Sequence, residues 1–151
     1  MNSVETRTEG ITSPPWIDKL KSLVLIVMEK LKIENSEVSL LLCNDAVIRE
    51  LNKKYRGSDT PTDVLSFSQI EGDDEPAVTQ GIRTLGDIVI SLERVKENAE
   101  MENEDYENEL KRVIIHGILH LLGYDHAEGE ESSMIKKQEK ILKDVMEEKL
   151  F

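Results

Sequence analysis

The chain has 151 residues with 33% charged side chains, enough length for one domain with a buried core, expected over residues 1–151. Its one cysteine excludes an internal disulfide and fits a reducing compartment. The first residues do not resemble a signal peptide, and no apolar stretch approaches the roughly 20 residues that span a bilayer, so we expect a cytoplasmic protein. A net charge of −12 argues against broad nucleic-acid binding, because phosphate contacts need Lys and Arg.

Hydropathy patterns predict the first half of the fold. Residues 4–8 alternate in polarity, which is typical of an edge strand. Ser13 and the prolines that follow it predict a helix start, and apolar residues at helical spacing continue to residue 31. The apolar run 38–43 predicts a buried strand. Asn44 or Asp45 can cap the next helix, which should end near Gly57, and residues 63–67 predict another strand.

The second half begins with a polar, acidic segment, 69–82, which predicts a loop. Residues 85–90 predict a fourth strand, followed by a helix that starts near Ser91. A helix from about residue 103 should carry the first two histidines, with acidic residues in its first turn. A last helix is expected over about 130–148, with its inner stripe formed by Met134, Ile135, Ile141, Leu142, Val145 and Met146. These elements predict an α+β fold, a small mixed four-stranded sheet packed with about five helices.

All three histidines of the chain lie within eleven positions, 116 to 126. His116 and His120 are about one helical turn apart and so share a helix face. Gly123 can adopt the left-handed conformation that ends a helix, after which His126 can return toward the first two rings. Three imidazoles suit zinc and leave a fourth tetrahedral position for water, although they also accept nickel, copper or iron. A structural zinc site normally has four protein ligands, often cysteines. The one cysteine here, Cys43, lies in an apolar run, so we favour a catalytic metal over a structural one.

The histidine spacing resembles the zinc-binding run H-E-x-x-H-x-x-G-x-x-H of the metzincin proteases. Their glutamate takes a proton from metal-bound water, and Gly117 stands at its position here. Glycine cannot act as a base. Peptide hydrolysis by that mechanism is therefore disfavoured.

The run from His116 to His126 also resembles the signature of the YbeY-type endoribonucleases, which are bacterial rRNA maturation factors. Residues 51–56, 62–67 and 85–88, in sequence LNKKYR, TDVLSF and LGDI, resemble further motifs of that family in the same order. The similarity covers about residues 38–126. It implies a zincin-like metal helix and a zinc ion held by His116, His120 and His126. It also implies an endoribonuclease specific for single strands, in small-subunit rRNA maturation and ribosome quality control.

The resemblance implies a role for Arg56, which falls at the family's arginine next to the site. Its forked donors could hold a phosphate and stabilise charge in the transition state. The alternative is a surface arginine attracted to the carbonyls of a helix end. Asp125 could orient a ligand histidine or simply form the turn. Thr62 and Asp63 fit ordinary loop chemistry, whereas Asp87 lies in an apolar strand and needs a partner or an opening.

The expected partners are single-stranded RNA, rRNA of the small ribosomal subunit and ribosomal proteins, with neither a membrane nor DNA. A local basic cleft on the acidic chain would draw on Lys53, Lys54, Arg56 and Arg83. Two other functions stay open. The chain could be a metallohydrolase of a small molecule or peptide, or a non-catalytic ribosome assembly factor in which the metal only fixes the turn at Gly123.

Overall fold

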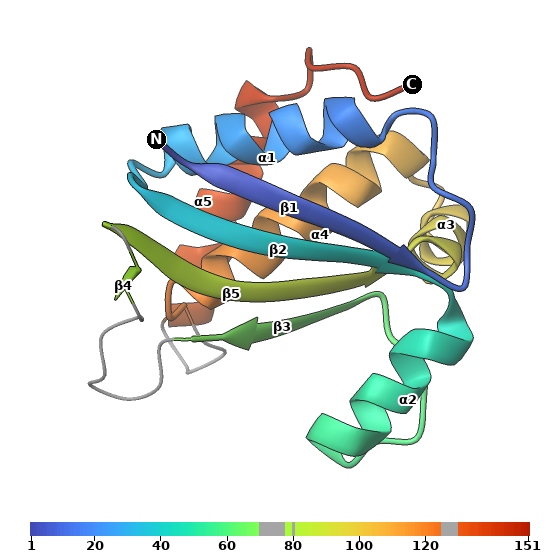
Figure 1. Ribbon diagram of the computed structural model, residues 1–151. Coiled ribbons are helices and arrows are strands. Elements are labelled where there is room, and N and C mark those ends of the chain that lie inside the picture. Colours follow the sequence, from blue (N-terminus) through green and yellow to red (C-terminus); the bar gives the residue numbers. More distant parts are fainter. Residues whose placement is uncertain (70–77, 80, 125–129) are drawn as a thin grey trace.

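The computed structural model describes residues 1–69, 78–79, 81–124 and 130–151, with side-chain burial omitted at 78–79 and 130–132. Its elements form one sheet and a layer of helices (Figure 1). The bounds in chain order are β1 Ser3–Glu9, α1 Ile17–Lys30, β2 Ser36–Cys43, α2 Asp45–Arg56, β3 Val64–Ser68, β4 Val78–Thr79, β5 Ile82–Ser91, α3 Leu92–Met101, α4 Tyr106–Leu121 and α5 Glu130–Asp144.

The sheet is mixed, in the order β1-β2-β5-β3. Strands β1, β2 and β5 run parallel to one another, whereas β3 pairs antiparallel with β5. The two-residue strand β4 also pairs with β5. The prediction of an α+β fold with four principal strands and about five helices is confirmed. Strand β3 lies at the edge of the sheet, which leaves its outer side open to a neighbouring element or a ligand.

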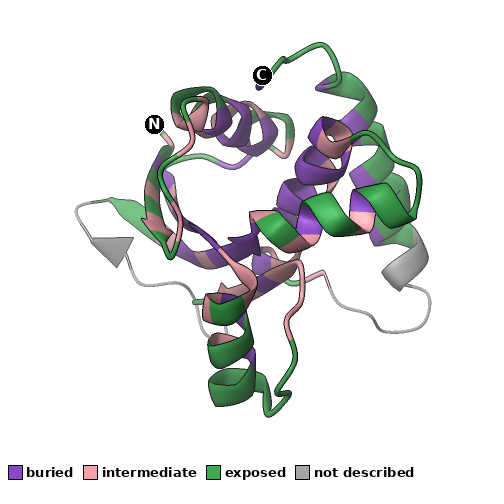
Figure 2. Cartoon of the chain, turned by 90° about the vertical axis from the view of Figure 1, so that its right-hand side faces the viewer, coloured by how far each residue is buried: buried purple, intermediate pink, exposed green. Residues whose placement is uncertain are grey.

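Alternation along the strands gives the sheet two unequal apolar faces. In Figure 2 the buried residues gather where helices and sheet meet. One face carries the main core, where α1, α3, α4 and α5 pack on residues such as Leu40, Leu42 and Ile88. The other face holds a small cluster, in which Ile48 of α2 packs on residues such as Val89. Helix α2 is therefore separated from α4 by the edge strand β3.

Several boundaries differ from the sequence-based predictions. The expected loop 69–82 contains β4 and the start of β5, while residues 70–77 and 80 lie outside the described residues. Helix α4 begins at Tyr106 rather than near Asn103, because Asn103 has a left-handed φ of 55° and the Asp105 side chain caps the helix by accepting from the Asn108 N–H.

The last helix is also shorter than predicted, and it ends at Asp144. Ile135 is 48% exposed and Met146 is 43% exposed, so the prediction that both belong to the inner stripe is wrong. Ile135 follows the buried Met134 and is rotated about 100° away from it on the helix. Met146 lies beyond the helix end. No helix in the described part of the chain is both long and apolar enough to span a bilayer.

Two buried charged side chains of α4 hold the C-terminal residues in place. The Lys111 side chain is fully buried, and its Nζ donates to the carbonyls of Val145 at 3.1 Å and Met146 at 3.3 Å. The Glu107 carboxylate accepts from the backbone N–H groups of Leu150 and Phe151. These contacts fix α5 against α4, which matters because α4 carries His116 and His120.

We expect Lys111→Met to destabilise the fold by about 1–3 kcal/mol, because it leaves the buried carbonyl of Val145 and the partly buried carbonyl of Met146 without their donor. The free energy of unfolding in urea measures this loss. The matched control is Lys143→Met, since Lys143 is an exposed residue of α5. Equal urea midpoints for the Lys111 and Lys143 variants would contradict the proposed anchoring.

Candidate functional site

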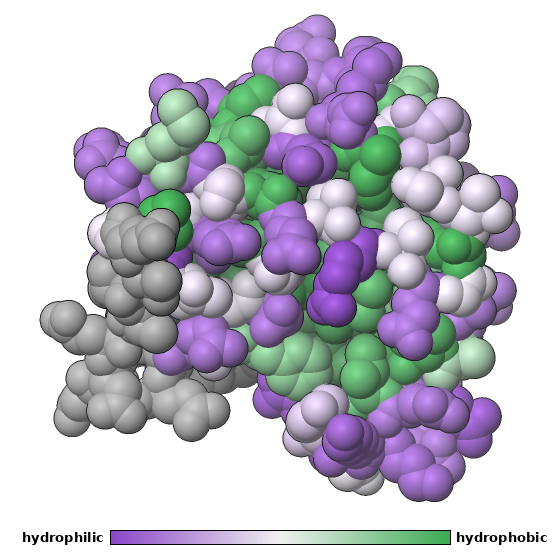
Figure 3. Space-filling view, in the orientation of Figure 1, coloured by the Kyte–Doolittle hydropathy of each residue, from purple (hydrophilic) through white to green (hydrophobic). Residues whose placement is uncertain are grey.

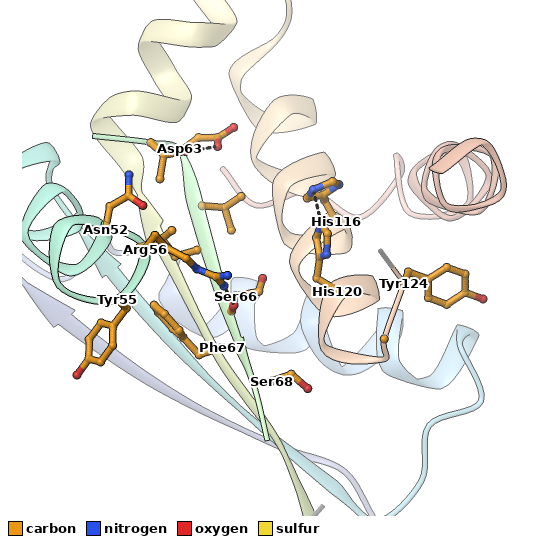
Figure 4. A pocket seen from close by; sticks show the side chains of 14 residues that line it. Asn52, Tyr55, Arg56, Asp63, Ser66, Phe67, Ser68, His116, His120 and Tyr124 are labelled. Carbon is orange, nitrogen blue, oxygen red and sulfur yellow. Dashed lines mark hydrogen bonds between the residues drawn. The ribbon is translucent and has the colours of Figure 1, made fainter. Parts of the chain in front are cut away.

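An open cleft of about 910 Å³ lies between α2, the edge strand β3 and the C-terminal half of α4 (Figure 4). Helix α2 contributes residues from one wall, and α4 contributes two histidines from the other. The residues that line the cleft are Asn52, Tyr55, Arg56, Thr62, Asp63, Val64, Leu65, Ser66, Phe67, Ser68, His116, His120, Gly123 and Tyr124. Three of the four sequence segments that resemble the YbeY-type family thus meet at this cleft.

The structure brings His116 and His120 together on one face of α4. Their Nε2 atoms are 3.0 Å apart, and the ring centroids are 4.5 Å apart. Two nitrogens bound to one tetrahedral zinc at about 2.0–2.1 Å would be separated by roughly 3.3 Å. Both rings are half-buried and line the cleft. The pair therefore presents two ring nitrogens to one point at a spacing that fits a shared cation.

A third side chain, Gln138 of α5, reaches the histidine pair. Its Oε1 lies 2.8 Å from Nδ1 of His116, and Gln138 is only 7% exposed. An amide oxygen can only accept, so Nδ1 of His116 carries the proton and its Nε2 lone pair is directed toward His120. Sequence reasoning missed Gln138, although it lies four residues after Met134 and three before Ile141, on the inner stripe of α5, because only apolar residues were assigned to that stripe.

The third predicted ligand, His126, lies outside the described residues, as does Asp125. The chain reaches them through Gly123, whose φ of 96° is the left-handed conformation predicted for the end of the metal helix. Within the described residues, no group of three His, Cys, Asp or Glu side chains could hold a metal ion. The participation of His126 therefore stays a prediction.

Gly117 is a packing residue between α4 and the sheet. A Cβ at this position would lie 3.0 Å from Ile88 Cγ2 and 3.3 Å from the Ser66 hydroxyl oxygen. Ser66 also donates from its hydroxyl to the Gly117 carbonyl at 3.3 Å. A side chain at the position of the metzincin glutamate would therefore first meet Ile88 of β5 and Ser66 of β3.

Arg56 extends from the end of α2 to the edge strand. Its Nη2 donates to the Ser66 carbonyl at 2.7 Å, and its Cζ lies 5.5 Å from the centre of the Phe67 ring. The guanidinium is thus directed at β3 and the cleft, which favours the phosphate-binding role over attraction to the end of its own helix. Thr62 and Asp63, interpreted from sequence as ordinary loop residues, also line the cleft.

Two other titratable residues lie away from the histidines. Asp87 is half-buried and pairs in the sheet with Ser39 and Phe67, on the face opposite the main helical layer, so its carboxylate avoids the main core. Cys43 is buried. Its burial, together with the Glu9 and Asp45 carboxylates, raises the pKa of its thiol to about 12. It therefore stays a neutral thiol near pH 7, poorly suited to ligate a metal.

The fold and the cleft together define a class of small α+β protein that presents a histidine pair, one helical turn apart, beside an open polar cleft. The model of the family described as "Endoribonuclease YbeY" matches residues 3–146. The chain belongs to this family. Membership supports a hydrolytic endoribonuclease role in rRNA processing.

Individual relatives agree with the family model. The chain is 45% identical over 145 residues to the endoribonuclease YbeY of Treponema pallidum strain Nichols, a match that covers 94% of the chain and 89% of that protein. It is 48% identical over 128 residues to the same enzyme of Treponema denticola, covering 82% of the chain and 80% of that protein. The solution structure of TM1509 from Thermotoga maritima matches with a TM-score of 0.69 and 33% identity, over 96% of this chain and 90% of that one.

Proposed function

We propose that the chain is a zinc-dependent endoribonuclease specific for single-stranded RNA. We infer that it acts in the cytoplasm, in maturation of the small-subunit rRNA and in ribosome quality control, alongside ribosomal proteins. The observation that carries the proposal is the pair of Nε2 atoms of His116 and His120, 3.0 Å apart at the wall of an open cleft. His126 would supply the third imidazole.

The residues present fit zinc better than they fit a hard cation. The donors that converge are imidazole nitrogens, which suit zinc, whereas Mg²⁺ and Ca²⁺ prefer carboxylate and carbonyl oxygens. The bond from His116 Nδ1 to Gln138 puts the ring proton on Nδ1, so Nε2 is the nitrogen of His116 that would bind the cation. When bound, a zinc ion supplies Lewis acidity toward a phosphoryl oxygen or water.

The side chains of the cleft can hold the RNA for this chemistry. Arg56, anchored to the Ser66 carbonyl, stands at the edge of the cleft with forked N–H donors that match phosphate oxygens. There it can orient a phosphate and stabilise the negative charge that grows during cleavage. Gly117 provides no base, so proton transfer falls to another group, and the ribose 2′-OH can serve as the nucleophile.

A substrate panel before and after metal removal tests the proposal. We expect the purified protein to cleave single-stranded RNA, to leave duplex RNA and amide or ester substrates intact, to lose activity with a chelator, and to regain it with zinc. Unchanged RNA cleavage by protein verified to be free of metal would contradict metal dependence. Equal cleavage of duplex RNA would contradict strand specificity.

One observation favours the second candidate, a peptide hydrolase. Strand β3 forms both an edge of the sheet and a wall of the cleft, and an extended peptide can add to such an edge. Gly117, which cannot act as a base, and membership of the endoribonuclease family argue against peptide hydrolysis. Cleavage of the amide substrates in the panel would distinguish a peptide hydrolase from a ribonuclease. A non-catalytic assembly factor would instead show no cleavage of any substrate, and its histidine variants would lose stability in step with function.

Arg56→Ala is expected to lower kcat/KM for single-stranded RNA by roughly 100-fold, the scale of losing one preorganised donor to a transition state. The conservative variant Arg56→Lys should recover only part of this loss, because an ammonium lacks the planar fork. Steady-state kinetics at low RNA concentration measure the effect. Cleavage by Arg56→Ala at the parental rate would remove Arg56 from the site.

A further inference from the structure

Two aromatic rings and two cations gather where α2 meets the edge strand β3, and three of these four residues, Tyr55, Arg56 and Phe67, line the cleft. Tyr55 is 56% exposed, and its ring centroid lies 5.3 Å from that of Phe67 in an edge-to-face arrangement. The Arg56 guanidinium lies 5.5 Å from the Phe67 ring, and the Lys54 ammonium lies 5.1 Å from the Tyr55 ring. We call Tyr55, Phe67, Lys54 and Arg56 the aromatic platform.

The aromatic platform is held in place although its surface is exposed. Phe67 belongs to strand β3 and packs against the small apolar cluster under α2. Helix α2 is fixed by the buried Ile48 and by Asn52, whose Nδ2 donates to the Thr60 carbonyl at 2.9 Å. The helix then ends at Gly57, which has the left-handed φ of 71°. A rigid aromatic surface costs little conformational entropy when it binds a flat ligand.

The aromatic platform is continuous with the histidine pair across the edge strand. Side chains alternate along β3, so Phe67 faces α2 while Ser66 faces α4 and donates to Gly117, next to His116. Arg56 crosses this strand edge by donating to the Ser66 carbonyl. Figure 4 shows Tyr55 and Phe67 on one side of β3 and the two histidines on the other, with Arg56 between them.

We propose that the aromatic platform stacks an unpaired nucleobase of the RNA, next to the phosphate held by Arg56; this inference rests on the proposed function. Every base has a π-face, and base–aromatic stacking is tolerant of sequence. A base in a duplex keeps its faces covered by its neighbours, so the platform would select single strands. Stacking also lets a chain of net charge −12 bind RNA through a local surface. On the face of the molecule seen in Figure 3, hydrophobic and hydrophilic residues are interspersed.

Binding of two probes of equal charge separates stacking from phosphate attraction. One is a short oligoadenylate with 2′-O-methyl riboses, which prevents attack by the 2′-OH, and the other is an abasic oligomer of the same length and backbone. We expect the parent, loaded with zinc, to bind the oligoadenylate about 5- to 100-fold more tightly. In Tyr55→Leu this preference should shrink severalfold, and in Tyr55→Phe it should persist. The matched control is Met101→Leu, an exposed apolar side chain of α3.

The outcomes separate a failure of the aromatic platform from a failure of the proposed endoribonuclease function. Parent protein that cleaves RNA but binds both probes equally would overturn the platform and leave the proposed function intact. The platform would also be overturned if Tyr55→Leu kept the full preference for bases. Parent protein that neither cleaves nor binds RNA would overturn both, and would leave the aromatic platform as a surface for a protein partner.

A different observation carries a second inference. Gln138 comes from α5, is nearly fully buried, and contacts Nδ1 of His116 at 2.8 Å. The geometry points to Gln138 as a positioning residue, which fixes the tautomer and ring orientation of His116 for the cation. Outer partners of ligand histidines typically change metal affinity by 10- to 100-fold. The anchoring of α5 by Lys111 would then contribute to the metal site through Gln138.

Zinc affinity, measured by competition with a chromogenic chelator, tests this role apart from activity. We expect Gln138→Leu to bind zinc about 10- to 100-fold more weakly, and Gln138→Glu to bind at least as tightly as the parent, because a carboxylate also accepts from Nδ1. Ile141→Ala controls for lost packing, since Ile141 is buried on the same helix. Parental affinity in Gln138→Leu, or equal losses in Gln138→Leu and Ile141→Ala, would overturn the inference. A parent protein without zinc affinity would overturn the metal site itself.

Discussion

Replacing His120 with alanine is expected to abolish stoichiometric zinc binding and to lower RNA cleavage by about 1000-fold or more. The change removes one of two nitrogens that lie 3.0 Å apart, and a single imidazole from α4 cannot hold the cation in place. The effect should exceed the 10- to 100-fold that outer-shell partners contribute. Elemental analysis of the protein and single-turnover cleavage of single-stranded RNA measure the two consequences.

The same variant separates an enzyme from an assembly factor. His120 is half-buried at the cleft and is not part of the main core, so His120→Ala should unfold within about 1 kcal/mol of the metal-free parent. Lys140→Ala, an exposed change on α5, serves as the control. Full metal content with full cleavage in His120→Ala would show that the proposed site is wrong. A loss of stability that matched the loss of function would favour a structural metal.

The fold was largely predictable because its signals are local. The buried run in β2 and the capping side chains of Asn44 and Ser91 follow from strand and helix chemistry that acts within a few residues, and both caps accept the expected backbone N–H. Where an element ends depends on tertiary contacts instead. Helix α5 stops early, and the chain after it is held to α4 by Lys111, a residue type that patterns place at the surface.

The candidate site also has residues that local sequence signals predict and residues that only tertiary packing reveals. His116 and His120 could be paired from the sequence, because one helix sets their spacing. Gln138 is 22 residues away from His116 and on another helix, so only the packing of α5 on α4 reveals it. The aromatic platform likewise depends on how α2 lies along the edge strand. The segment from Leu51 to Arg56 was noted through its family resemblance and its positive charges, and neither gave Tyr55 a role.

Gly117 offers the second large effect, this time on stability. We expect Gly117→Glu to destabilise the fold by several kcal/mol and to create no peptidase activity. Alanine in a helix gains up to about 1 kcal/mol over glycine, but forcing atoms into a packed core costs about 1–3 kcal/mol and burying a carboxylate costs more. The Cβ would meet Ile88 Cγ2 at 3.0 Å, and the rest of the side chain would have to enter the contact between α4 and the sheet.

The glycine variants form a graded series in urea unfolding. Gly117→Ala should lose about 0–2 kcal/mol, where the helix propensity gained partly offsets the close contact, and Gly117→Glu should lose far more. Lys140→Glu adds the same carboxylate to an exposed position of α5 and should change little. If Gly117→Glu matched the parent in stability, the close packing of α4 on β5 would not require glycine. If it also hydrolysed peptides, residue 117 would face the cleft, and the separation of this chain from the metzincin mechanism would fail.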